Sequence, residues 1–95
     1  MASQMYIYLI EQNVNSDWDF YDSAVVVAPD IQTARFTHPD NESIWNGKTW
    51  VDKKTRLDLF VTEPWCHPSH VDVQLIGVAS EKTQPGVICA SFNAG

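Results

Sequence analysis

The densest group of potentially reactive side chains lies between residues 66 and 70, where one thiol and two imidazoles occur together: Cys66, His67 and His70. Zinc prefers these ligands, but a structural zinc site uses four of them, usually in paired clusters, and the sequence offers one cluster. A thiol nucleophile would need an imidazole beside it. Adjacent side chains on an extended segment point in opposite directions, which separates Cys66 from His67. These residues are therefore weak candidates for metal or thiol chemistry, and we expect Cys66 in the core with both histidines exposed.

The basic residues are unevenly distributed, because four of the six fall between residues 48 and 56, beside two tryptophans. Cationic side chains next to indole rings are suited to neutralise a phosphate and to stack on a base. The sequence thus predicts a site for a nucleotide-like anion, formed by Arg35, Trp45, Lys48, Trp50, Lys53, Lys54 and Arg56. The alternative is that the lysines are solvated turn residues, since Asp52 and Asp58 dilute the positive field.

A second segment sets three carboxylates among three aromatic rings: Asp17, Trp18, Asp19, Phe20, Tyr21 and Asp22. A calcium loop needs a glycine at its bend and a closing bidentate glutamate, and this segment lacks both. Aromatic side chains are typical anchors at protein interfaces, and the carboxylates would suit a basic partner surface. The alternative is a hairpin loop whose aromatic side chains fold back on the sheet.

Length and charge limit the possible functions. The chain of 95 residues predicts a single domain spanning residues 1–95, and its 44% hydrophobic and 19% charged residues are typical of a globular protein. The formal charge of −6 opposes binding to a long nucleic acid, whose phosphates need a basic surface. The sequence has no glycine-rich phosphate loop, nucleophile elbow or His-Glu-x-x-His pattern, so we expect neither an enzyme nor a bound cofactor.

The sequence also indicates a cytoplasmic protein without a membrane segment. The start of the chain lacks the basic residues and the long apolar run of an export signal. No stretch approaches the roughly 18 apolar residues of a membrane helix. The two cysteines, Cys66 and Cys89, are then expected to be reduced thiols, as is usual in the cytoplasm.

Local patterns predict the elements that must position these residues. Runs of β-branched and aromatic residues predict four strands, over residues 5–10, 23–28, 71–79 and 86–95, with a loop over 13–22. Proline start and stop signals predict a short helix over residues 29–37. Residues 38–65 are expected to form an irregular excursion, with a tight hairpin at Asn46-Gly47 and a short strand over 57–61. The sum is an α+β fold with a mainly antiparallel sheet of four strands, whose order the sequence does not specify.

Both faces of this predicted sheet carry apolar side chains. Tyr6, Tyr8 and Ile10 share one face of the first strand, and Ile88, Ala90 and Phe92 share one face of the last. A single helix covers one face only, so the other face needs a cover. A second copy of the chain, giving a homo-oligomer, and residues 40–65 are the two alternatives.

Several sequence blocks occur in the same order as in a known group of proteins. They are Tyr8–Val14, Tyr21–Val26, Ala34-Arg35 with His38-Pro39, Trp65-Cys66, Val71–Ala79 and Gly86–Gly95. In these blocks the chain resembles a family of small orphan accessory proteins encoded by tailed bacteriophages and prophages. The closing Leu75–Ala79 and Ala90–Gly95 are the most specific, and Asn46–Glu63 lies outside the resemblance. The family has no assigned activity, so the resemblance implies no catalytic residues.

The resemblance implies a phage accessory protein in the cytoplasm of a bacterial host. Small phage proteins of this kind are expected, from the genes that neighbour theirs, to inhibit host defence or to sequester its nucleotide signals. The prediction is a non-enzymatic protein that binds and neutralises a host component, as a counter-defence sponge for a nucleotide-like anionic signal. The alternative is a protein–protein inhibitor of a host defence protein that uses the acidic and aromatic loop.

Overall fold

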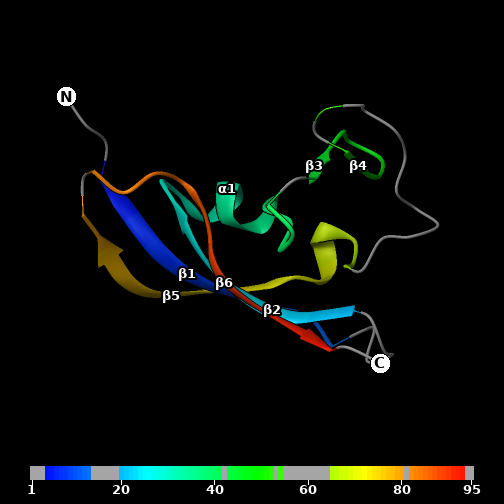
Figure 1. Cartoon of the computed structure of the whole chain (residues 1–95), viewed down its shortest axis with the longest axis horizontal. Helices are drawn as coiled ribbons and strands as arrows, with labels where there is room; N and C mark the ends of the chain where they lie inside the picture. Colours follow the sequence, from blue (N-terminus) through cyan, green and yellow to red (C-terminus); the bar gives the residue numbers. More distant parts are fainter. Residues whose placement is uncertain are drawn as a thin grey trace.

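The computed structural model describes residues 4–13, 20–41, 43–52, 54, 65–80 and 82–93. The elements are β1 (Met5–Glu11), β2 (Phe20–Ala28), α1 (Ile31–Arg35), β3 (Ser43–Trp45), β4 (Trp50–Asp52), the 3-10 turn η1 (Pro68–His70), β5 (Asp72–Ala79) and β6 (Gly86–Asn93). Four strands form an antiparallel sheet in the order β5-β1-β2-β6, and β3 and β4 form a separate two-stranded sheet (Figure 1). The predicted α+β class is confirmed.

The two central strands are β1 and β2, whose apolar residues continue on both faces. Alternation along β1 separates these faces, because Tyr8 and Ile10 are buried while Ile7 and Leu9 are half-buried. Tyr8 lies opposite Val26 on β2, and Val26 is fully buried. The core therefore lies on the face that carries Tyr8 and Ile10.

The remaining described elements supply the other side of this core. Buried residues come from the sheet, from α1, from β4 and from the segment before β5: Tyr8, Ile10, Ala24, Val26, Ala28, Ala34, Trp50, Trp65, Cys66 and Val71. Figure 1 shows α1 and the β3–β4 sheet on the same side of the four-stranded sheet. The described part of residues 40–65 thus packs on the helix side and does not cover the opposite face.

The helix α1 is shorter than the predicted range of 29–37. Asp30 is its N-cap, and the Asp30 Oδ1 accepts a hydrogen bond from the Thr33 N–H at 2.7 Å. Pro29 therefore precedes the cap instead of occupying the first helical turn. The helix ends before Thr37, whose N–H turns back to the carbonyl of Ala34. Among the described residues, no helix is long and apolar enough to cross a membrane.

Two local predictions differ in outcome. The hairpin at Asn46-Gly47 is confirmed, with Trp45 opposite Trp50 and Gly47 at a φ of +102°. The second strand was expected from residue 23, but β2 begins at Phe20, because β6 provides partners for Phe20 and Tyr21 at this end. The predicted strand over 57–61 lies outside the described residues.

Both outer strands of the sheet contain an irregularity. In β5 the pairing moves from Gly77 opposite Ile7 to Leu75 opposite Tyr8, which leaves Ile76 as an extra residue. In β6 the extra residue is Ile88. A β-bulge of this kind bends the strand and interrupts its regular ladder. Both isoleucines are about half exposed, at 49% and 58%.

Candidate functional site

The predicted anion site contains two tryptophans that the structure does bring together. Trp45 and Trp50 lie opposite each other on β3 and β4, with ring centroids 5.4 Å apart and planes at 68°. Trp50 is fully buried, and its indole N–H donates a hydrogen bond to the Cys66 carbonyl at 2.8 Å. A base cannot stack on a buried ring, so Trp50 is a core residue and only the half-buried Trp45 keeps an accessible surface.

The cations of that predicted site are not gathered beside the rings. Arg35 Nη1 donates hydrogen bonds to the carbonyls of Val71 at 2.5 Å and Pro68 at 3.3 Å, which ties α1 to η1. Lys48 lies in the hairpin turn, whereas Lys54 follows the end of β4, so these two exposed lysines flank opposite ends of the small sheet. Lys53 and Arg56 lie outside the described residues. The described residues therefore provide no convergent set of cations.

The cysteine and histidine cluster has the arrangement expected of it. Cys66 is buried, while His67 and His70 are exposed. The His67 Nδ1 accepts a hydrogen bond from the Ser69 N–H at 3.1 Å, and the Ser69 hydroxyl lies 2.8 Å from the same nitrogen. His67 thus closes the η1 turn. Among the described residues, no group of three His, Cys, Asp or Glu side chains is placed to hold a metal ion.

A third histidine, for which the sequence indicates no defined role, lies in the aromatic core. His38 is almost completely buried, with its ring perpendicular to Trp50 at a centroid distance of 5.0 Å. Its Nδ1 lies 3.1 Å from both the backbone nitrogen and the Oδ1 of Asp40. The Nε2 atom has no hydrogen-bond partner among the described residues. Only packing distinguishes His38 from the exposed histidines, and packing leaves no local sequence signal.

The predicted partner loop is only partly described. Asp17, Trp18 and Asp19 lie outside the described residues, and Phe20 opens β2. Tyr21 packs against the core, with its ring 6.2 Å from His38, so this aromatic residue folds back on the sheet instead of facing a partner. Asp22 is exposed and accepts a hydrogen bond from the Ser91 hydroxyl at 3.4 Å.

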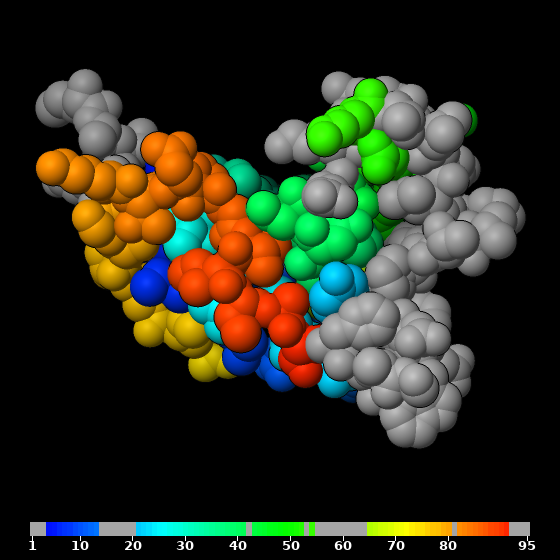
Figure 2. Space-filling model, in the orientation of Figure 1, coloured from blue at the N-terminus to red at the C-terminus, as the bar shows by residue number. Residues whose placement is uncertain are grey.

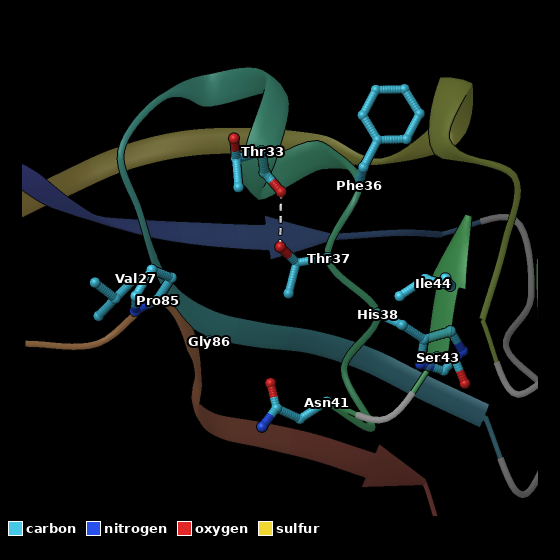
Figure 3. Close-up of a pocket in the computed structure, with 10 residues that line it drawn as sticks. All are labelled: Val27, Thr33, Phe36, Thr37, His38, Asn41, Ser43, Ile44, Pro85 and Gly86. Carbon is cyan, nitrogen blue, oxygen red and sulfur yellow. Dashed lines mark hydrogen bonds between the residues drawn. The ribbon is translucent and has the colours of Figure 1, made fainter. Parts of the chain in front are cut away.

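A pocket of about 180 Å³ lies between α1, the loop that follows it and the start of β6 (Figure 3). Among the described residues that line it there is no Lys, Arg, Asp or Glu side chain. The Thr37 hydroxyl donates to the Thr33 carbonyl at 2.7 Å, and the Asn41 Oδ1 accepts from the Val87 N–H at 3.2 Å. Figure 2 shows green residues after α1 meeting orange and red residues around the start of β6. These two hydrogen bonds hold the helix end and the start of β6 in place.

The face of the four-stranded sheet opposite the core is only partly buried around Leu9 and Val25. Leu9 lies opposite Gln74 on β5 and opposite Val25 on β2, and Val25 lies opposite Cys89 on β6. Leu9 and Val25 are half-buried, while Gln74 and Cys89 are exposed. Together with part of the next row along the strands, these residues form what we call the open face: Met5, Ile7, Leu9, Val25, Gln74, Gly77 and Cys89. Val27, which lies opposite Ile7 on β2, is almost completely buried and does not belong to it.

Two observations support the assignment of this face. A Cβ atom at Gly77 would lie 3.6 Å from the Ile7 Cδ1, so Gly77 and Ile7 point to the same side. Ile7 is half-buried, unlike Tyr8, its neighbour on the core side. The open face is thus an apolar surface on two central strands, with β5 and β6 at its borders.

Carboxylates line one end of the open face. Glu11 and Asp72 lie directly opposite each other on β1 and β5, and both are exposed. Glu11 also lies opposite Ser23 on β2, and Ser23 lies opposite Ser91 on β6. The Ser91 hydroxyl contacts Asp22, which places this third carboxylate at the same end. We call Glu11, Asp72 and Asp22 the acidic end. Among the described residues, neither Glu11 nor Asp72 forms an ion pair.

The chain was compared with protein-family models, with curated proteins and with solved structures, and none of the three comparisons found a match. The function must therefore be inferred from the surfaces described above.

Proposed function

We propose that this protein is a non-enzymatic binding protein that neutralises another protein by docking it on the open face. The observation that supports this proposal is the half-buried apolar surface over Ile7, Leu9 and Val25 on the two central strands. A partly exposed apolar face on central strands is typical of a surface that another molecule completes. In the setting that the phage resemblance implies, the partner is a protein of the bacterial host.

Binding on the open face would inhibit the partner by steric cover of its surface. The face is built on regular strands, which hold apolar side chains in fixed positions, and a rigid surface loses little entropy on association. The formal charge of −6 favours a basic partner, because opposite charges speed the encounter of two proteins.

The test is affinity capture from a bacterial lysate with two matched variants. Leu9→Gln changes the open face, whereas Leu75→Gln makes the same change at an exposed leucine opposite Tyr8, on the core side of the sheet. We expect wild type and Leu75→Gln to retain the same partner and Leu9→Gln to lose it. Thermal melting must show both variants to be folded.

Cys89 provides a second readout in the wild-type chain. Its thiol is exposed on the open face, whereas the Cys66 thiol is buried, so alkylation labels Cys89 selectively. We expect the captured partner to slow the alkylation of Cys89, and a bulky maleimide on Cys89 to block capture. A complex in which Cys89 reacts as fast as in the free protein, and which Leu9→Gln still forms, would refute the proposal.

A sponge for a nucleotide-like anion is the second candidate, and Trp45 is the observation that favours it. The Trp45 ring is half-buried, lies 4.8 Å from the His67 ring and belongs to the same hairpin as Lys48. A ligand stacked on Trp45 would quench its fluorescence in a titration with nucleotides, and Trp45→Phe would remove that response. An unchanged spectrum of the wild-type protein would exclude this candidate for the nucleotides tested.

A further inference from the structure

We infer that the partner element on the open face is an amphipathic helix with basic residues at the end that lies over Glu11 and Asp72. This inference rests on the proposed function, because it assigns the chemistry of the partner to the same surface. The apolar side of the helix would contact Ile7, Leu9 and Val25.

The dimensions of the face match one helix. Four strands at 4.7–4.9 Å spacing give a surface about 14 Å wide, and a helix with its side chains is about 10–12 Å in diameter. From Met5 to Glu11, β1 rises about 20 Å. A helix of about 13 residues has the same length, which gives it nearly four turns of contact.

Charge determines which helix fits. Glu11 and Asp72 are directly opposite on neighbouring strands, and like charges in that position destabilise a sheet. Asp22 adds a third carboxylate on the same row through its contact with Ser91. An arginine or lysine of the partner, placed at this end, would offset the repulsion and form charge-assisted hydrogen bonds.

The described residues of a second copy of this chain would not supply those cations. In a two-fold dimer, each copy presents the same open face to the other. The described basic residues lie elsewhere, with Arg35 on α1, Lys48 and Lys54 in and after the hairpin, and Lys82 between β5 and β6. Each copy also carries a formal charge of −6. Charge complementarity therefore favours a basic partner over self-association.

The test is disulfide exchange between the Cys89 thiol and three synthetic peptides of about 16 residues, each with one cysteine supplied as its disulfide with glutathione, so that glutathione is the leaving thiol. The first has a leucine stripe and two arginines in one terminal turn. The second replaces those arginines by glutamates. The third keeps the arginines but replaces the leucines by glutamines. At equilibrium, the share of Cys89 held by each peptide measures its non-covalent contact with the open face.

We expect the first peptide to exceed the second about tenfold at low salt, because two ion pairs distinguish them. The preference should fall to about twofold in the Glu11→Gln/Asp72→Asn variant and at high salt, which screens exposed charges. Asp30→Asn is the matched control for Asp72→Asn, because it removes one carboxylate on the helix side and asparagine still caps a helix. It should leave the preference unchanged.

The outcomes separate this inference from the proposed function. Equal shares of the first and second peptides, both above the third, would overturn the basic helix and leave the apolar docking face standing. Equal shares of all three would overturn both. Sedimentation of the wild-type protein as a dimer whose Cys89 is protected from alkylation would assign the open face to a second copy instead.

Discussion

The Trp50 indole N–H donates a hydrogen bond to the Cys66 carbonyl at 2.8 Å, joining the two-stranded sheet to the segment that leads into η1. Both residues are buried, so this bond lies inside the core. It explains why a tryptophan in a predicted ligand site belongs to the folding core instead.

Trp50→Phe should lower the free energy of unfolding by about 2–4 kcal/mol, since it leaves a cavity and removes a donor from a buried carbonyl. Trp45→Phe is the matched control on the opposite strand, where the ring is half-buried. Its cost should be about 1 kcal/mol or less. Urea unfolding of both variants measures the difference, and equal costs would contradict the assigned role of Trp50.

Arg35→Met should lower the free energy of unfolding by about 2 kcal/mol, because the carbonyls of Val71 and Pro68 lose a charged donor. Lys48→Met removes the same charge from an exposed turn residue and should change stability by about 0.5 kcal/mol or less. Chemical denaturation measures both. If Arg35→Met instead left stability intact and weakened nucleotide binding, Arg35 would belong to an anion site after all.

Acid should weaken the start of α1 through Asp30. Hydrogen bonds from the Thr33 backbone N–H, the largest cause, and from its side chain lower the pKa of Asp30 below its ordinary value of 3.8. A lowered folded-state pKa means that the stabilisation is present above pH 3.8 and is lost as the pH falls through the folded value. Wild type should therefore exceed Asp30→Ala in stability at neutral pH, and the gap should shrink in acid. A gap independent of pH would contradict this assignment.

Gly86→Ala should be destabilising by about 1 kcal/mol or more, because Gly86 has a φ of +142° and a new Cβ would lie 3.1 Å from the Asn41 Oδ1. Gly77→Ala is the control within the same sheet. Its Cβ would meet Ile7 at an ordinary 3.6 Å, and its φ is outside the left-handed region. The melting temperature of Gly77→Ala should be higher than that of Gly86→Ala, and the reverse order would refute the strain argument.

Local signals in the sequence predicted the elements well. Dense β-branched runs such as residues 23–28 form strands in many contexts, and Asn46-Gly47 specifies its own tight turn. The start of β2 at Phe20 was missed, because pairing with residues more than 60 positions away extended the strand. Strand order could not be predicted for the same reason, since it depends on contacts between residues that are distant in sequence.

The candidate sites were harder to predict, because residue type does not reveal burial. Trp45 and Trp50 look equivalent in the sequence, yet only Trp50 is fully enclosed. His38 shares its type with His67 but lies inside the aromatic core. The open face could not be predicted from the sequence, because it depends on two facts of the fold. The strands β1 and β2 are central, and α1 and Trp50 lie on the same side of the sheet.

The extra residues Ile76 and Ile88 have a consequence for the behaviour of many copies in one cell. An exposed outer strand with apolar side chains can template the stacking of further chains into fibrils. Here both outer strands are bent at a bulge, so an incoming strand meets no long, flat row of hydrogen-bonding groups. The two bulges therefore oppose the edge-to-edge pairing of further chains at β5 and β6.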